Sequence, residues 1–227
     1  MAITVFAEGS GRSSGLTTSH NLGSHTINGG RLGIFMLMVS RDTIGPQPVA
    51  VSLSIAGNAC TKLVSNTYEV GQTDVSIWSY RNTTGSNITG TVIATADNVC
   101  FAVISVATLT GFVFPIYGST QTAEGLRYLY DEQSLTPTHI SGVILGIGGT
   151  SEIGVGTRMD GTEIHNLYTY SYSYIGTHYK TFSGSAITSL KWDWDDADKY
   201  QNWNVCMLEI TENSISAPSD GVLFRMT

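Results

Sequence analysis

The chain contains few charged residues. Asp, Glu, Lys and Arg make up only 13% of its 227 residues, against about a quarter in typical soluble proteins. The eleven basic residues are scattered and the net charge is −7, so the clustered positive footprint that nucleic-acid binding requires is missing. Ser, Thr, Asn, Gly and Tyr must therefore cover the surface, which suits close contact with another surface or with sugars.

Long apolar runs are also missing. None reaches the roughly 20 residues that span a bilayer, so we expect no membrane partner. The N-terminal MAITVFAEGSGRSSG has neither a basic region nor a long apolar core, so we expect no signal peptide. The three cysteines, Cys60, Cys100 and Cys206, are odd in number and lack metal-type spacing. Cys100 and Cys206 lie in apolar segments, which predicts buried free thiols and synthesis in a reducing compartment.

Short apolar segments with a period of two recur between Gly- and Asn-rich turns, and no helical periodicity exceeds about two turns. Residues 75–95 (VSIWSYRNTTGSNITGTVIAT) predict a hairpin of two strands joined by a polar turn. The almost wholly apolar LGIFMLMVS, residues 32–40, predicts a central strand buried on both faces. The pattern indicates a single all-β domain over residues 1–211 with about ten to twelve strands, a sandwich or barrel.

Three further segments carry more specific expectations. In residues 49–55, alternation predicts that Val49, Val51, Leu53 and Ile55 face a core. Residues 111–130 predict a long aromatic connection lying on the sandwich. Residues 167–174 (LYTYSYSY) predict a strand with Tyr168, Tyr170, Tyr172 and Tyr174 on one face, either a cross-strand ladder or a surface between subunits.

The chemistry-bearing motifs of enzymes do not stand out. The five histidines show no metal-ligand spacing, the glycine-rich segments fit no phosphate loop, and no Gly-x-Ser-x-Gly elbow occurs. Acid pairs for glycoside hydrolysis can be distant in sequence, but nothing singles out two of the eighteen acids. We therefore expect no catalytic residues, no enzyme activity and no cofactor.

The segment KWDWDDAD, residues 191–198, is the most chemically loaded. Asp193, Asp195, Asp196 and Asp198 are weak candidates for a calcium site. The segment lacks the central glycine and closing glutamate of a helix-loop-helix site, so a solvated acidic loop is the favoured interpretation. Trp192, Trp194 and the nearby Tyr200 could stack on sugar rings. Alternation with aspartates favours the other interpretation, in which the two tryptophans share one buried face.

Three landmarks occur in order between about residues 17 and 211: GGRLGIFMLMVS, the strand VSIWSYRN with its polar turn, and the closing WNVCMLEI. The chain thereby resembles the jelly-roll β-sandwich modules of bacterial and phage proteins. It departs from their pattern in having no proline after Arg81-Asn82, and in its residues 212–227, a C-terminal arm. Two interpretations of the arm stay open: docking on a neighbour, or packing on its own domain.

The resemblance implies a virion component of a phage, made in the host cytoplasm. The first hypothesis is a capsid decoration or stabilising protein that binds the major capsid protein or another virion protein as a homo-oligomer, with a trimer favoured. Its expected docking residues are at the two ends of the chain: Ile3, Val5, Phe6, Val222, Leu223 and Phe224. The alternative is a carbohydrate-binding module or receptor-binding tail adhesin that holds a glycan with Trp192, Trp194 and Tyr200.

Overall fold

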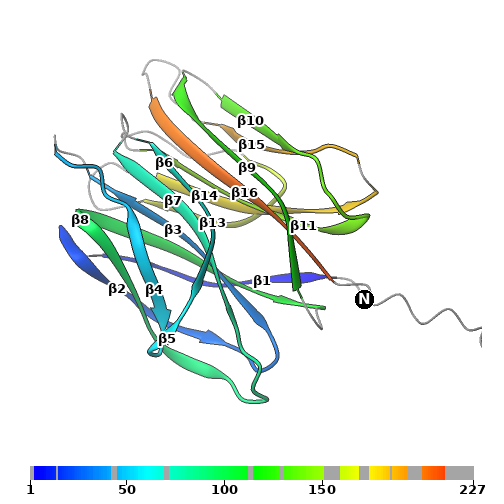
Figure 1. Ribbon diagram of the computed structural model, residues 1–227, viewed down its shortest axis with the longest axis horizontal. Coiled ribbons are helices and arrows are strands. Elements are labelled where there is room, and N and C mark those ends of the chain that lie inside the picture. The colour runs from blue at the N-terminus through cyan, green and yellow to red at the C-terminus, as the bar shows by residue number, and fades with distance from the viewer. Residues whose placement is uncertain are drawn as a thin grey trace, which may run out of the picture.

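The fold is built from antiparallel strands throughout, as a computed structural model shows (Figure 1). The structure describes residues 3–13, 15–41, 45–68, 72–111, 115–127, 130–150, 159–168, 174–184, 186–193 and 201–212. These ranges contain strands and no helix, so the prediction of an all-β antiparallel protein is confirmed. The strands within them are β1 (Thr4–Arg12), β2 (Thr17–Ile27), β3 (Leu32–Ser40), β4 (Ala50–Ile55), β5 (Asn58–Ala59), β6 (Thr61–Tyr68), β7 (Thr73–Arg81), β8 (Ile88–Thr110), β9 (Pro115–Arg127), β10 (Tyr130–Leu135), β11 (Ser141–Thr150), β12 (Met159–Asp160), β13 (Thr162–Tyr168), β14 (Tyr174–Ser183), β15 (Thr188–Asp193) and β16 (Gln201–Glu212).

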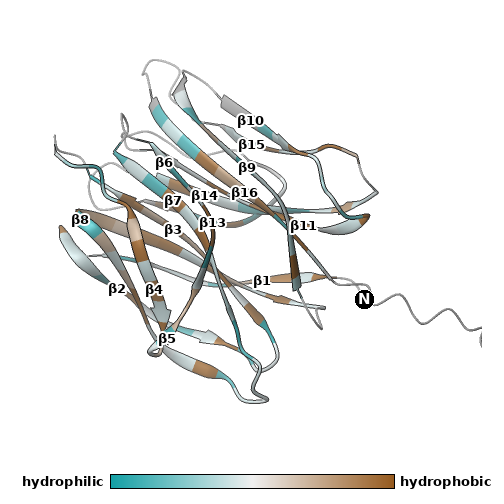
Figure 2. Ribbon diagram, viewed as in Figure 1, coloured by the Kyte–Doolittle hydropathy of each residue, from teal (hydrophilic) through white to brown (hydrophobic). Residues whose placement is uncertain are grey.

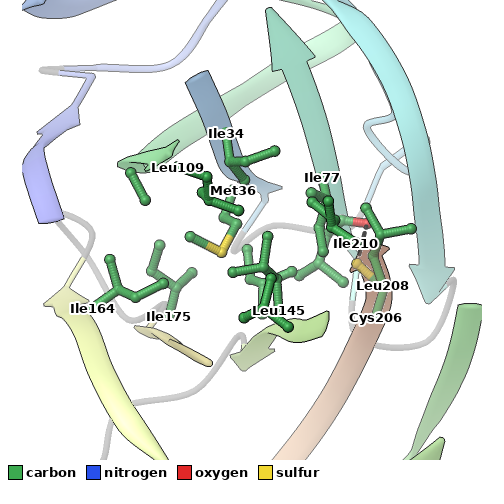
Figure 3. Close-up of a cluster of buried hydrophobic side chains, with 14 of the residues drawn as sticks. Ile34, Met36, Ile77, Leu109, Leu145, Ile164, Ile175, Cys206, Leu208 and Ile210 are labelled. Carbon is green, nitrogen blue, oxygen red and sulfur yellow. Dashed lines mark hydrogen bonds between the residues drawn. The ribbon is translucent and has the colours of Figure 1, made fainter. Parts of the chain in front are cut away.

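Three sheets are stacked. The largest has the order β5-β4-β8-β3-β7-β6, with β1 and β2 also pairing with β8. The second has the order β13-β14-β11-β16-β9 and the third β10-β15-β12. One apolar core lies between the first two sheets, where Met36 and Ile77 meet Leu145 and Leu208 (Figure 3). Each such buried aliphatic side chain contributes about 1.5–3 kcal/mol through removal from water.

Strand β3 is the centre of the largest sheet. All nine of its residues are buried, and it pairs with β7 on one side and β8 on the other. Figure 2 shows apolar residues along β3 and in the middle of β16. The prediction of a central strand buried on both faces is therefore confirmed. It holds because each face of β3 has its own core, with Met36 in one and Phe35 in the other.

The hairpin predicted over residues 75–95 is wrong. Residues 82–87 do connect two strands, but β3 lies between β7 and the second half of β8. The first half of β8 pairs instead with β2 and β4. Strand β8 is one 23-residue strand that changes partners near residues 96–100, where two separate strands were predicted. Its first half folds back over β3 and β7, and the second core, which includes Leu53, Trp78 and Val92, fills the space between.

Three further sequence predictions are corrected. Leu53 and Ile55 are buried as expected, but Val49 is only half-buried and Val51 is 60% exposed. Ala50 is buried in their place, because the pairing of β4 with β8 shifts by one residue between Ala50 and Ser52. Residues 115–127 form the edge strand β9, paired along its length with β16, and not a loose connection. Tyr168 ends β13 opposite Tyr174 at the start of β14, so the two belong to different strands. Tyr170 and Tyr172 lie outside the described residues.

Candidate interaction surfaces and buried polar sites

The docking residues expected near the N-terminus are partly used by the chain itself. Ile3 and Val5 pack against the core between the first two sheets. Phe6, on the opposite face of β1, is 38% exposed, and the guanidinium carbon of Arg31 lies 4.4 Å from its ring centroid. A cation over an aromatic face is a stabilising contact, so Phe6 is half covered by its own chain. Val222, Leu223 and Phe224 lie outside the described residues.

Trp192 cannot stack on a sugar. Its side chain is fully buried in the third core, and its indole Nε1–H donates to the carbonyl of Gly176 at 3.2 Å. A Cβ on Gly146 or Gly148 would collide with the indole, so both glycines make room for it. The indole is thus packing inside the protein, which agrees with the interpretation favoured from its alternation with aspartates. Trp194 and Tyr200, the other members of the expected platform, lie outside the described residues.

The expected weak metal ligands lie almost wholly outside the described part of the chain. Asp193 ends β15, and only its backbone is described, while Asp195, Asp196 and Asp198 lie outside the described ranges. Elsewhere in the described ranges, no group of three His, Cys, Asp or Glu residues has the geometry to hold a metal ion.

Three exposed apolar residues that sequence reasoning missed lie near the place where β8 changes partners. Leu16, Val51 and Val99 are 47%, 60% and 42% exposed. They come from three neighbouring segments: Leu16 precedes β2, whose Thr17 pairs with Cys100, and Val51 is next to Ala50, which pairs with Ala96. We call these three residues the bend patch. The sequence could not indicate it, because the exposure of Val51 and Val99 depends on the register shift in β4 and the bend in β8.

A second exposed pair lies at the opposite end of the molecule. Ile140 and Ile187 are 79% and 68% exposed, and we call them the end patch. Their two connections run side by side, because Ser141 pairs with Ser183 on one side and Leu135 with Thr188 on the other. The Gly184 N–H donates to the Ile140 carbonyl between them.

The end patch lies beside the ends of β1 and β16. Thr4 pairs with Thr110 at the end of β8, and Glu212 pairs with Pro115 just beyond it. Figure 1 shows the start of β1 and the end of β16 on the same side of the molecule. From Thr110 to Val99, β8 runs eleven residues, which is about 36 Å in an extended strand. The two patches are therefore separated by the length of the sheet.

A buried carboxylate fixes the loop beneath the end patch. The Glu209 side chain is fully buried, and its Oε2 accepts from the Ser119 N–H, the Thr138 N–H and the Thr138 hydroxyl, each at 2.9 Å. Its Oε1 accepts from the His139 N–H at 3.0 Å and pairs with His139 Nδ1 at 2.9 Å. Burial by itself raises the pKa of Glu209, but the hydrogen bonds from Thr138, Ser119 and His139 outweigh it and lower that pKa to about 2.

Two contacts that could suggest nucleophilic chemistry are structural. Ser105 Oγ lies 2.8 Å from His165 Nδ1, and Thr177 Oγ1 lies 2.8 Å from Ser105 Oγ, so this network ties β8 to β13 and β14. Ser105 is fully buried, which keeps a substrate away from its hydroxyl. Burial, reinforced by the nearby His25, lowers the pKa of His165, so the imidazole is neutral. The network joins the first two sheets.

The second contact joins two buried residues of the largest sheet. His20 Nε2 lies 3.3 Å from Cys100 Sγ. Burial, reinforced by Asp97, raises the pKa of the Cys100 thiol to about 12, and burial lowers the pKa of His20. A protonated thiol beside a neutral imidazole makes a weak hydrogen bond with it and is not an activated nucleophile. Cys100 and Cys206 are buried free thiols, as predicted.

A shallow cleft of about 350 Å³ opens near the Ser105 network, between β1 and β13. It is lined by Ser10, Gly11, Arg12, Val103, Asn166 and Leu167. The amide of Asn166 already donates to Glu163 at 2.6 Å. The cleft combines few convergent polar groups with little apolar lining, which is unlike a small-molecule site.

Comparison with known proteins leaves the chain without an assigned relative. No protein-family profile matches it, no curated protein matches it, and no solved structure matches it. Over the ranges that the structure describes, no helix is long and apolar enough to cross a membrane.

Proposed function

We propose that this chain is a structural protein of a phage virion, a jelly-roll β-sandwich that decorates the capsid surface by protein–protein binding. Its partner is the major capsid protein or another virion protein, and it acts as a homo-oligomer. The observation that carries the proposal is the bend patch of Leu16, Val51 and Val99, exposed on a molecule whose surface is poor in charge.

The chemistry of this surface fits protein binding. Isolated exposed apolar residues are ordinary. In this proposal the three exposed residues on neighbouring segments are covered together by one partner, because exposed apolar groups near one another are typical of interaction sites. Stable interfaces combine an apolar centre, depleted of charge, with a polar rim. Ser52 and Thr95, which hydrogen-bond to each other at 2.6 Å beside Val51, supply such a rim without a charge that would need desolvation.

The residues at the two ends of the chain become secondary in this proposal. Ile3 and Val5 already pack on the core, and Phe6 is stacked under Arg31. By contrast, the three side chains of the bend patch, Leu16, Val51 and Val99, are each at least 42% exposed in the part of the chain that the structure describes. Val51 lies in β4, which pairs with β8, so a strand of the sheet presents this part of the patch.

The experiment is a particle-binding assay with the double variant Val51→Asp/Val99→Asp. Two buried aspartates in an interface centre should reduce occupancy on the particles by about tenfold or more. Thr83→Asp, an exposed substitution in the 82–87 connection, is the matched control and should bind normally. Circular dichroism and the thermal midpoint check that both variants fold. Unchanged occupancy of the double variant would overturn the bend patch as the docking surface.

Immunogold labelling in the source lysate tests the location separately. Gold over particle heads supports decoration of the capsid. Gold at tail tips, or on cell surfaces without particles, overturns decoration and moves the function to glycan or receptor binding.

A further inference from the structure

The turn between β2 and β3 contains Asn28-Gly29, the one place in the sequence where glycine follows asparagine. Such a pair is prone to deamidation, because glycine has no side chain to keep its backbone nitrogen away from the asparagine side chain. In that reaction the Gly29 nitrogen bonds to Cγ of Asn28, and the Cγ–Nδ2 bond breaks. Ammonia leaves with the proton of the Gly29 N–H, and a cyclic imide remains. Water then opens the imide to an aspartate or an isoaspartate at position 28.

The Gly29 nitrogen is engaged elsewhere in the folded protein. Its N–H donates to Oδ1 of Asn87 at 3.1 Å, in the connection between β7 and β8. A backbone nitrogen becomes a nucleophile only after it loses its proton, and an amide oxygen accepts hydrogen bonds but is too weak a base to remove that proton. The bond to Asn87 therefore keeps the proton on the Gly29 nitrogen and directs the N–H away from the reaction.

The connection of residues 82–87 also holds the peptide around Gly29 in place. A Cβ on Gly29 would lie 2.5 Å from the Gly85 carbonyl oxygen, so the two backbones are in close contact. The N–H of Gly30, the next residue, donates to the Thr84 carbonyl at 3.0 Å. Formation of the imide requires the peptide between positions 28 and 29 to rotate, and these contacts oppose that rotation.

The connection is in turn anchored to the strands on either side of the turn through Asn82. The buried Asn82 side chain donates to the carbonyls of Ile27 and Ser86 at 3.0 and 2.9 Å. Its backbone N–H donates to the Arg31 carbonyl at 3.0 Å. Gly29 is therefore released only when the turn and the connection separate, and such a local opening costs free energy.

We propose that Asn28 is a latent deamidation site and that its contact partner Asn87 keeps it unreacted in the folded protein. Only molecules in which the 82–87 connection has opened react, so the modification accumulates with the frequency of that opening. The reaction adds a negative charge to the turn between β2 and β3, and an isoaspartate also adds an extra atom to the backbone there. The inference goes beyond the proposed function and is tested on the purified full chain, so it stands or falls independently of particle binding.

Peptide mass spectrometry after incubation of the purified chain at mildly alkaline pH measures the conversion of Asn28. Asn87→Ala removes the acceptor of the Gly29 N–H and should speed the conversion by about tenfold, which is the effect expected for the loss of one hydrogen bond. Asn87→Asp is the matched control, because its carboxylate keeps an acceptor oxygen at this position, and it should react no faster than wild type. Circular dichroism and the thermal midpoint check that both variants fold.

Hydroxylamine gives a second measurement that needs no variant, because it cleaves a chain at the cyclic imide of an Asn-Gly pair. The native wild type should stay intact under conditions in which the urea-unfolded wild type is cut between Asn28 and Gly29. Cleavage of the native wild type as fast as of the unfolded chain would overturn the proposal. Equal conversion rates in the wild type and the folded Asn87→Ala variant would also overturn it, and so would equal acceleration by Asn87→Ala and Asn87→Asp.

Discussion

Glu209→Gln should destabilise the protein in a pH-dependent way. The carboxylate is fully buried and accepts from three backbone N–H groups and the Thr138 hydroxyl, besides pairing with His139. A glutamine keeps the shape but replaces one acceptor oxygen with an NH₂ group. Whichever way the amide turns, donors then face donors, and buried groups lose their partners. The Gln variant should lose about 2–4 kcal/mol at pH 7.

The pKa of Glu209 gives the size and sign of the pH-dependent part. That pKa is about 2, lowered from the ordinary 4.5. At about 1.4 kcal/mol per pH unit, this difference corresponds to about 3 kcal/mol of folding stability. A carboxyl with a depressed pKa contributes fully above pH 4.5, and the contribution falls as pH drops from 4.5 through 2. At pH 3 about 1.4 kcal/mol should remain.

The assay is urea unfolding followed by tryptophan fluorescence at pH 7, 5, 4 and 3. Asp74, whose pKa is raised by burial, contributes with the opposite sign. The quantity to follow is therefore the stability difference between wild type and Glu209→Gln at each pH, in which Asp74 cancels. We expect this difference to shrink steadily between pH 5 and pH 3. Glu163→Gln is the control, because Glu163 is exposed and the contact described for its side chain is a hydrogen bond from Asn166. The stability of this variant should stay within about 0.5 kcal/mol of wild type. If the stability difference between wild type and Glu209→Gln is the same at every pH in this range, the reasoning is refuted.

Three further outcomes follow from the packing. Gly118→Ala should cost about 1–3 kcal/mol in urea unfolding, because the new Cβ would collide with Glu209 Oε2 and crowd the Thr138 hydroxyl; if the cost is the same in a Glu209→Ala background, the collision is not its cause. Trp192→Ala should cost about 3–5 kcal/mol, as for other buried aromatic residues; a stable variant that has lost only glycan binding would contradict this. The pKa values of Cys60 and Cys100 are raised by burial to about 12, so Ellman's reagent at pH 8 should label the native protein slowly and the urea-unfolded protein at all three thiols; fast native labelling of Cys100 would show that its thiol is accessible.

The local sequence pattern predicts the fold class correctly but predicts the wrong strand pairing. The run of residues 32–40 predicted a strand buried on both faces, because an apolar run this short leaves no polar face for water. The alternation of 75–81 and 88–95 correctly predicts strands, but the predicted pairing of these two neighbours is wrong, because β3 lies between β7 and the second half of β8. Which strands pair is a matter of contacts distant in sequence, and a period of two is the same for every choice of partner.

The candidate sites show the same difference between what a local pattern predicts and what depends on contacts distant in sequence. The sequence marked Trp192 as aromatic beside aspartates, and the alternation correctly favoured burial. It marked Glu209 only as the acid of a closing strand motif. The donors to Glu209 come from Ser119, Thr138 and His139, 70 to 90 residues earlier in the chain. No local signal could have brought these groups together.

The sequence by itself determined that this protein is all-β, that β3 is central, and that Cys100 and Cys206 are buried free thiols, because each follows from the hydrophobic pattern around the residue. Only the tertiary structure decided that Val51 is exposed, that β8 serves two halves of a sheet, and that Ile140 and Ile187 share one end of the molecule. These depend on a one-residue register shift, a bend and the pairing of distant strands. Such features arise from the packing of whole sheets, which a linear pattern does not encode.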